Sequence, residues 1–227
     1  WENRCLHRGL RLSIGRNDGL ELRCQYHGWR YANRSAGCTY IPAHPADAPA
    51  RTICNRTFPS VERYGLIWSG EEPTGEPPEI AALENAETLL LRSIAVNAPL
   101  NLVLGHLANY RFSITGDPDN LATTSMDYQD ECSLSLTATC DGKKSTVVFF
   151  VQPVDSNRSV IRGVLSNSPE GAERLLTLRH HSAELSRLRD IVELEALDGP
   201  SLEPMVATIE QVPIALSDIT TPSGRKA

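Results

Sequence analysis

The stretches that decide the fold are Cys5-Leu6-His7 and Cys24-Gln25-Tyr26-His27-Gly28-Trp29, near the start of a chain of 227 residues. Each run offers one thiol and one imidazole, and sixteen residues lie between the two runs. Thiolates and imidazoles are ligands of transition metals. Two pairs of donors at this spacing therefore indicate a metal centre that two loops hold from opposite sides.

Two kinds of metal centre use these donors. A [2Fe–2S] cluster with mixed ligands takes two cysteines on one iron and two histidines on the other. A tetrahedral zinc ion uses the same atoms, but its ligands are usually spaced as Cys-x2-4-Cys and His-x3-5-His. The order found in this chain, Cys-x-His followed by Cys-x2-His, favours the cluster. A zinc-bound structural or interaction domain is the alternative from a different class.

These residues resemble the Rieske proteins of the soluble oxygenase and ferredoxin branch. Cys5-Leu6-His7-Arg8-Gly9 is similar to the family's Cys-Pro-His-Arg-Gly, with leucine at the proline position, and Gly37-Cys38-Thr39-Tyr40-Ile41-Pro42 resembles its third loop. The resemblance spans residues 1–70 and implies an all-β domain. The cluster ligands that it implies are Cys5, His7, Cys24 and His27. The residues that it implies around them are Arg8, Gly9, Tyr26, Gly28, Trp29, Tyr31 and Pro42.

The membrane-complex branch of the family has different residues from this chain at several positions in the ligand loops. Its loops carry a disulfide where Leu10 and Tyr26 stand here, and a serine where Trp29 stands. Tyr31 is retained. Hydrogen bonds to cluster sulfur raise the reduction potential, so the loss of one of two donors predicts a potential toward the low end of the Rieske range, about −150 mV. Such a potential suits a relay between a flavin reductase and an oxygenase iron.

Composition narrows the class of protein further. The net charge is −6, so we expect no basic surface to suggest nucleic acid or anionic lipid. No apolar run approaches the roughly 18 residues of a membrane span, and no signal peptide is visible, so we expect a cytoplasmic protein without a membrane partner. Iron–sulfur chemistry implies a reducing compartment, so we expect free, mostly buried thiols in the rest of the cysteines. These are Cys38, Cys54, Cys132 and Cys140.

The sequence predicts an α+β chain with four parts. Residues 1–70 form the Rieske domain, which we expect to be incomplete at its N-terminus because a cluster ligand follows so soon after Trp1. Residues 71–88 are a linker rich in proline and glutamate, residues 89–198 a helix-grip-like domain, and residues 199–227 a tail or a further linker. The helix-grip resemblance is to the catalytic domain of Rieske oxygenases and rests on the order of elements.

Periodicity and turn residues place those elements. Strands are predicted in residues 58–61, 66–68, 89–96, 133–139, 145–152 and 158–165. A helix is predicted after Asn97 as its cap, with an apolar stripe of Leu100, Val103, Leu104 and Leu107. Ser168-Pro169-Glu170 predicts the start of a long C-terminal helix. Its expected apolar stripe is Leu175, Leu178, Leu185, Leu188 and Val192.

The predicted second domain lacks a visible mononuclear iron site. Rieske oxygenases bind that iron through two histidines and a carboxylate, the histidines coming from an Asp-x2-His-x4-His run that this chain does not contain. We interpret His106 as a histidine at a helix surface or core edge. We interpret His180 and His181 as part of a solvated helix face. If Ile191-Val192-Glu193 aligns with the family's last helix, Leu188 stands at the carboxylate position, and Asp190 lies close by.

The lack of a visible mononuclear iron site agrees with a narrower resemblance. The reductases of bacterial caffeine-type N-demethylase systems carry an additional N-terminal Rieske domain, and residues 1–29 and 38–44 look similar to it. The resemblance implies an electron-transfer protein, or a domain of one, that relays single electrons from a reductase to a terminal non-haem iron oxygenase. The alternative is an oxygenase α subunit for hydroxylation or demethylation whose mononuclear iron site is incomplete. We expect no mononuclear iron and no nucleic acid partner.

Overall fold

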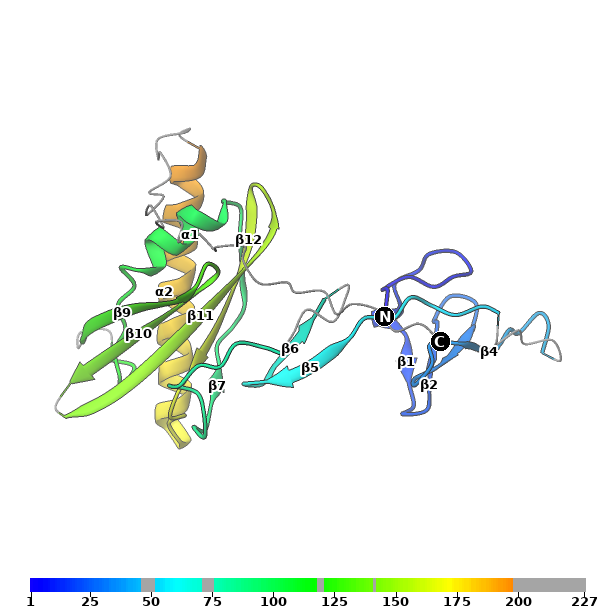
Figure 1. The fold of residues 1–227 in the computed structure, drawn as a ribbon, viewed down its shortest axis with the longest axis horizontal. Helices are drawn as coiled ribbons and strands as arrows, with labels where there is room; N and C mark the ends of the chain where they lie inside the picture. The colour runs from blue at the N-terminus through cyan, green and yellow to red at the C-terminus, as the bar shows by residue number, and fades with distance from the viewer. Residues whose placement is uncertain (46–51, 71–75, 118–120, 141, 198–227) are drawn as a thin grey trace, which may run out of the picture. The chain divides into compact units, whose positions relative to one another are not determined.

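The computed structural model describes residues 1–45, 52–70, 76–117, 121–140 and 142–197 (Figure 1). The chain divides into two compact units. The first holds Trp1–Leu90 and Val164–Ser168, and the second holds Leu91–Gly163 and Pro169–Ala227. The predicted tail, residues 199–227, lies outside the described residues.

The first unit contains an antiparallel sheet of short strands in the order β1-β2-β3-β4 and a separate hairpin, β5-β6. A 3-10 helix, η1, precedes the sheet. Strand β5 begins two residues later than the pattern predicts. It extends to Arg63, because Arg63 pairs with Leu66 of the partner strand β6. The bounds are η1 Leu12–Ile14, β1 Arg16–Asn17, β2 Glu21–Arg23, β3 Arg30–Ala32, β4 Cys38–Tyr40, β5 Ser60–Arg63 and β6 Leu66–Ser69.

The core of the four-stranded part of this unit is small and rich in sulfur. Two of the predicted ligands, Cys5 and Cys24, are buried in it together with Tyr31, and the two imidazoles of the predicted site lie outside it. A core of this size stabilises a fold only modestly, and a structural metal is a common addition in small domains. Its buried members are Cys5, Leu12, Cys24, Tyr31, Cys38 and Ile41.

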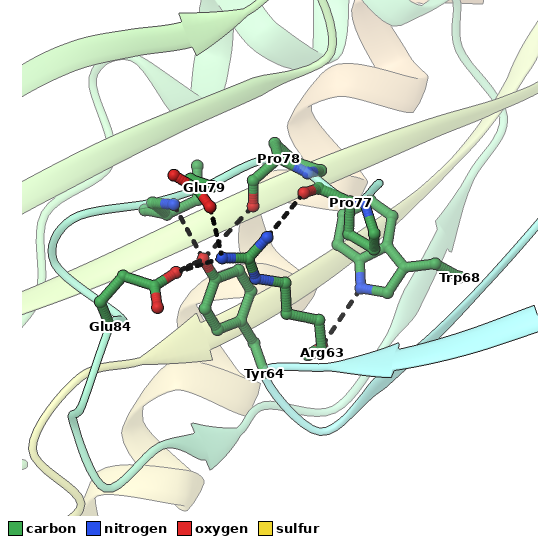
Figure 2. A network of polar contacts seen from close by, with 8 residues as sticks. Arg63, Tyr64, Trp68, Pro77, Pro78, Glu79 and Glu84 are labelled. Atoms are coloured by element: carbon green, nitrogen blue, oxygen red, sulfur yellow. Dashed lines mark hydrogen bonds and ion pairs between the residues drawn. The ribbon is translucent and has the colours of Figure 1, made fainter. Parts of the chain in front are cut away.

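Residues 77–84 fold back onto the β5-β6 hairpin (Figure 2). The Arg63 guanidinium donates to the Pro77 carbonyl at 2.9 Å and pairs with Glu84 at 2.7 Å. The Tyr64 hydroxyl also bonds the Glu84 carboxylate and accepts the backbone N–H of Ile80 at 2.8 Å. Part of the predicted linker is thus tied to the hairpin, while residues 71–75 lie outside the described residues. The boundaries of the predicted linker stay a prediction.

A larger antiparallel sheet follows the order β7-β12-β11-β10-β9, with β8 also paired to β12. The predicted strand over residues 89–96 is divided into β7 and β8. Strand β9 was not predicted, because most of its side chains are exposed and it shows no apolar alternation. The bounds are β7 Leu89–Leu90, β8 Ile94–Val96, β9 Thr123–Asp130, β10 Ser133–Cys140, β11 Lys143–Asp155 and β12 Arg158–Leu165.

Two helices complete the second unit, and Figure 1 shows the long one running behind strands β9–β11. Helix α1, Leu100–Leu107, begins after Pro99 and not after a capping Asn97, whose N–H is instead accepted by Glu193 at 2.7 Å. Helix α2 spans Gly171–Leu197 and begins later than Ser168-Pro169-Glu170 predicts. Of the helices in the described ranges, neither has a stretch apolar enough to serve as a membrane span.

The buried stripe of α2 differs from the predicted one in its first half. Leu175 is exposed and Leu178 only half-buried, whereas Thr177, His180 and His181 are buried. Thr177 and His181 continue the spacing of three and four residues that leads on to Leu185, Leu188 and Val192, so they share its face. The prediction of a solvated face for His180 and His181 is wrong.

Among the described residues the cysteines form no disulfide, but the burial of the four outside the predicted site differs from the expectation. Cys38 is fully buried in the sulfur-rich core. Cys54 is exposed, and Cys132 and Cys140 are half-buried. The expectation of mostly buried thiols is therefore wrong for three of the four cysteines outside the predicted site.

Candidate metal centre

Two loops with the same backbone hydrogen bonds present the predicted ligands. In the first, the N–H of Cys5 donates to the Leu10 carbonyl at 2.8 Å, and the N–H of Gly9 donates to the Cys5 carbonyl at 2.8 Å. In the second, Cys24 donates to Trp29 at 2.8 Å and Gly28 donates to Cys24 at 3.1 Å. Each loop thus closes five residues after its cysteine.

A glycine four residues after the cysteine lets each loop turn. Gly9 has φ of 71° and Gly28 has φ of 73°, in the left-handed region that glycine adopts without strain. A Cβ on Gly28 would also lie 3.3 Å from Cγ of Pro42 in the third loop. The sequence-predicted neighbours Gly9, Gly28 and Pro42 therefore shape the loops and their packing.

The two thiols lie together at the bottom of the loops. Burial raises the pKa of the Cys24 thiol, and the neighbouring Cys5 thiol raises it further. The Tyr31 hydroxyl lies 3.2 Å from Sγ of Cys5 and accepts the N–H of Leu6 at 3.2 Å. Burial also raises the pKa of Tyr31, so the hydroxyl stays protonated. It can therefore donate a hydrogen bond to a thiolate at Cys5.

The two imidazoles lie together at the rim. The ring centroids of His7 and His27 are 4.7 Å apart, and both side chains are exposed. Trp29 stacks on His7 at 4.9 Å with an interplanar angle of 6°, and Tyr26 lies against His27 at 3.7 Å. Desolvation, His27 and Arg8 all lower the pKa of His7, which favours the neutral imidazole that binds metals.

Asn55, which was not predicted as a site residue, holds the start of the first loop. Its side chain is buried, and its amide nitrogen donates to the carbonyls of Glu2 at 3.2 Å and Arg4 at 3.0 Å. Its backbone N–H donates to the Ala36 carbonyl at 2.9 Å. Asn55 therefore connects the chain just before Cys5 to the turn after β3, which no local pattern could reveal.

The candidate residues of the second unit have other partners. His106 is half-buried at a helix surface and bonds Glu195 at 2.7 Å, in line with the interpretation made from the sequence. Leu188 is buried, and Asp190 pairs with its neighbour Arg189 at 2.8 Å on the exposed side of α2. In the described ranges, no group of three or more His, Cys, Asp or Glu side chains is arranged to hold one metal ion.

His180 and His181 are held by hydrogen bonds inside the second unit. Nε2 of His180 accepts the N–H of Ser113 at 3.0 Å. Nδ1 of His181 bonds the Tyr110 hydroxyl at 2.8 Å, and its ring lies 5.2 Å from that of Phe112. Burial, with a smaller contribution from His180, lowers the pKa of His181 to about 3. These histidines are neutral components of the core.

The donor pairs match one kind of centre better than the other. A buried thiol pair with a donor aimed at one sulfur, beside an exposed imidazole pair, provides two ligands for each of two irons. A comparison with family models agrees, since residues 1–62 match the Rieske [2Fe–2S] domain. This part of the chain is a Rieske [2Fe–2S] domain, and a Rieske-type [2Fe–2S] cluster is the cofactor that such a domain implies.

The relatives that match this part of the chain confirm the family resemblance. The chain is 47% identical to oxidoreductase NdmD of Pseudomonas putida over 111 aligned residues. These residues make up 47% of this chain and 19% of NdmD. It is 38% identical over 93 residues to methylxanthine N1-demethylase NdmA of the same organism, covering 40% and 26% of the two chains. The present chain thus spans about a quarter or less of these relatives' length.

Solved structures extend the likeness of fold to most of the chain. The NdmA structure from Pseudomonas putida CBB5 has a TM-score of 0.62 at 21% identity, over 93% of this chain and 71% of that one. Apo dicamba monooxygenase has a TM-score of 0.64 at 18% identity, over 89% and 79%. The chain therefore combines a Rieske fold with antiparallel sheets and a C-terminal helix, as Rieske oxygenase structures do.

Substitution of Tyr31 by phenylalanine should lower the reduction potential without loss of the cluster. The change removes one hydrogen bond to Cys5 Sγ and keeps the ring in the core. A hydrogen bond that strengthens by about 1.4 kcal/mol on reduction raises the one-electron potential by about 60 mV, which the substitution removes. Voltammetry of the loaded protein would measure the shift, with Tyr40→Phe as a control. An unchanged potential in Tyr31→Phe would exclude the proposed donor role.

Proposed function

We propose that this chain is a one-electron relay in which Cys5, His7, Cys24 and His27 hold the Rieske-type cluster. In this proposal the thiolates bind one iron and the imidazoles the other. When bound, the cluster accepts and releases one electron at a time. The observation that carries the proposal is the side-by-side placement of the buried thiols and of the exposed imidazoles at the ends of two matching loops.

The residues of the site have separate tasks in this proposal. Cys5 and Cys24 are buried and hold the side of the cluster that is shielded from water. Tyr31 donates a hydrogen bond to Sγ of Cys5, which stabilises the negative charge added on reduction. His7 and His27 form the exposed edge through which an electron enters or leaves. The rings of Trp29 and Tyr26 pack on these imidazoles and fix their orientation.

The proposed partners are a reductase and a terminal oxygenase, either as separate proteins or as further parts of one polypeptide. The matches to NdmD, named an oxidoreductase, and to NdmA, named a demethylase, support a place in such a system. A cytoplasmic location and the absence of a nucleic acid partner belong to the same proposal.

For the rest of the chain we propose the four-part organisation given above, with a helix-grip fold in residues 89–198. The division between Leu90 and Leu91 supports a boundary near residue 89. The long helix α2, which contacts β8 and α1, supports the helix-grip proposal. The partners of His106 and Asp190 support a scaffold with no mononuclear iron.

An oxygenase α subunit is the second candidate function, because the likeness to the NdmA structure covers 93% of this chain. The two candidates differ in one measurable property. A relay takes up one electron per chain from dithionite, and added Fe(II) and nitric oxide give no new high-spin iron–nitrosyl signal. Stoichiometric formation of that signal would identify a mononuclear site and reject the relay in favour of the oxygenase.

A further inference from the structure

Three arginines stand in one row across the small sheet of the first unit. In the strand register, Arg16 of β1 is opposite Arg23 of β2, and Arg23 is opposite Arg30 of β3. Residues directly opposite in antiparallel strands have their side chains on the same face, and like charges at such positions are destabilising. The sheet thus concentrates positive charge along one line despite a cost in stability, which points to a use for this charge.

Among the described residues, few carboxylates form ion pairs with the row. Arg30 pairs with Glu21 at 3.6 Å and lies over the Tyr40 ring at 5.0 Å. Among the described residues, no ion pair joins a carboxylate to Arg16 or Arg23, and both side chains are exposed. Their guanidinium groups are therefore available to carboxylates of another molecule.

The row reaches the predicted cluster site. Nε and Nη2 of Arg23 each lie 3.6 Å from the point that a Cβ on Gly28 would occupy, next to His27 in the second loop. In the first loop, the exposed Arg8 directly follows His7. A guanidinium therefore lies in or against each of the two ligand loops.

The overall charge of the chain hides this feature. Residues 1–62 contain nine arginines, no lysine and five acidic residues, a net charge of +4. The whole chain has 22 basic and 28 acidic residues, so the remainder holds 13 and 23, a net charge of −10. The sequence-based conclusion that the chain has no basic surface was an effect of averaging over two parts of opposite sign.

We infer that Arg8, Arg16, Arg23 and Arg30 form a docking surface for an acidic electron-transfer protein that delivers its electron at the His7–His27 edge. The inference rests on the proposed relay function. Guanidinium groups bind carboxylates through two parallel hydrogen bonds, and opposite charge speeds diffusional encounter. One electron passes from the reduced partner to the chain, with no bond made or broken. An acidic electron-transfer protein fits better than a nucleic acid or a membrane, because the row ends against the loop of His27, an exposed imidazole through which the electron is proposed to enter.

Stopped-flow reduction of the full cluster-loaded chain by a reduced acidic [2Fe–2S] ferredoxin tests this surface. The second-order rate constant should fall about tenfold or more between about 20 mM and about 300 mM salt. Arg16→Glu should lower the low-salt rate constant about tenfold and reduce the salt dependence. Arg34→Glu changes the charge equally at an exposed position in the β3–β4 turn, and should stay within about twofold of the parent protein.

A second readout does not depend on electron transfer. Sedimentation velocity of a mixture with oxidised ferredoxin at low salt should show a complex that Arg16→Glu weakens and Arg34→Glu leaves intact. A rate constant independent of salt, or equal losses in both variants, would overturn the inference. So would salt-sensitive self-association without ferredoxin, which assigns the row to a second copy, or tighter binding to duplex DNA or anionic vesicles than to ferredoxin.

Failure of this inference can be told apart from failure of the relay function. A chain that dithionite reduces by one electron, but that ferredoxin reduces at a rate insensitive to salt, retains the proposed function and loses the docking surface. A chain that takes up no electron from dithionite fails at the level of the proposed function. Basic cytochrome c, as an oxidant of the reduced chain, supplies the opposite-charge control, and salt should not slow its reaction.

Discussion

Replacement of Cys24 by alanine is expected to remove the iron–sulfur cluster. The substitution deletes one of the two proposed thiolate ligands, and without it one iron keeps a single protein ligand. Metal binding and folding are coupled in small metal-dependent domains, so the loss should be close to complete. The visible absorption and the iron content should fall at least about tenfold relative to the parent protein.

Cys38→Ala is the matched control for this prediction. Cys38 is fully buried in the same core as Cys24, so both substitutions leave a similar cavity. Its thiol is not a proposed ligand, and Cys38→Ala should retain most of its iron. Equal loss of iron in both variants would show that core packing, and not ligation by Cys24, explains the effect.

The folding stability of the second unit is expected to fall by about 2 kcal/mol between pH 7 and pH 5 because of His181. Its folded pKa is lowered to about 3 from 6.5, so the unfolded chain binds a proton that the folded chain excludes. Stability is therefore fully present above pH 6.5 and is lost as the pH falls from 6.5 toward 3. At about 1.4 kcal/mol per pH unit, pH 5 accounts for about 2 kcal/mol.

Urea unfolding followed by the helical signal of α2 would measure this loss. His181→Gln removes the titrating group and should flatten the pH dependence by about the same amount, although it also changes the bond to Tyr110. His106→Gln alters the half-buried histidine on α1 and should keep the parent slope. If the slope survives in His181→Gln, the acid sensitivity comes from another group.

A candidate metal centre could be predicted from the sequence because its proposed ligands are local. In each loop the proposed ligands and their glycine lie within six residues, so their spacing in the sequence predicts that they lie close together in space. The hydrogen bond of Tyr31 to Cys5 and the clamp by Asn55 join residues 26 or more positions apart. Of these two, only the first could be anticipated, through the resemblance of Tyr31 to a family residue.

The second unit shows where pattern reading fails. Thr177 and His181 occupy stripe positions on α2, but polar side chains do not register as core in a search for apolar periodicity. Strand β9 presents mainly exposed side chains and owes its place to pairing with β10. The opposition of Arg16 and Arg23 depends on strand register, which composition and local motifs do not contain.

The central claim is that four residues of the first unit hold a [2Fe–2S] cluster and that the chain holds no other iron. Iron, zinc and acid-labile sulfide per chain after anaerobic reconstitution test it most directly. The account predicts about two irons, about two sulfides and no zinc. A single zinc or iron without sulfide would contradict the cluster, and a third iron without additional sulfide would contradict the scaffold role of residues 89–198.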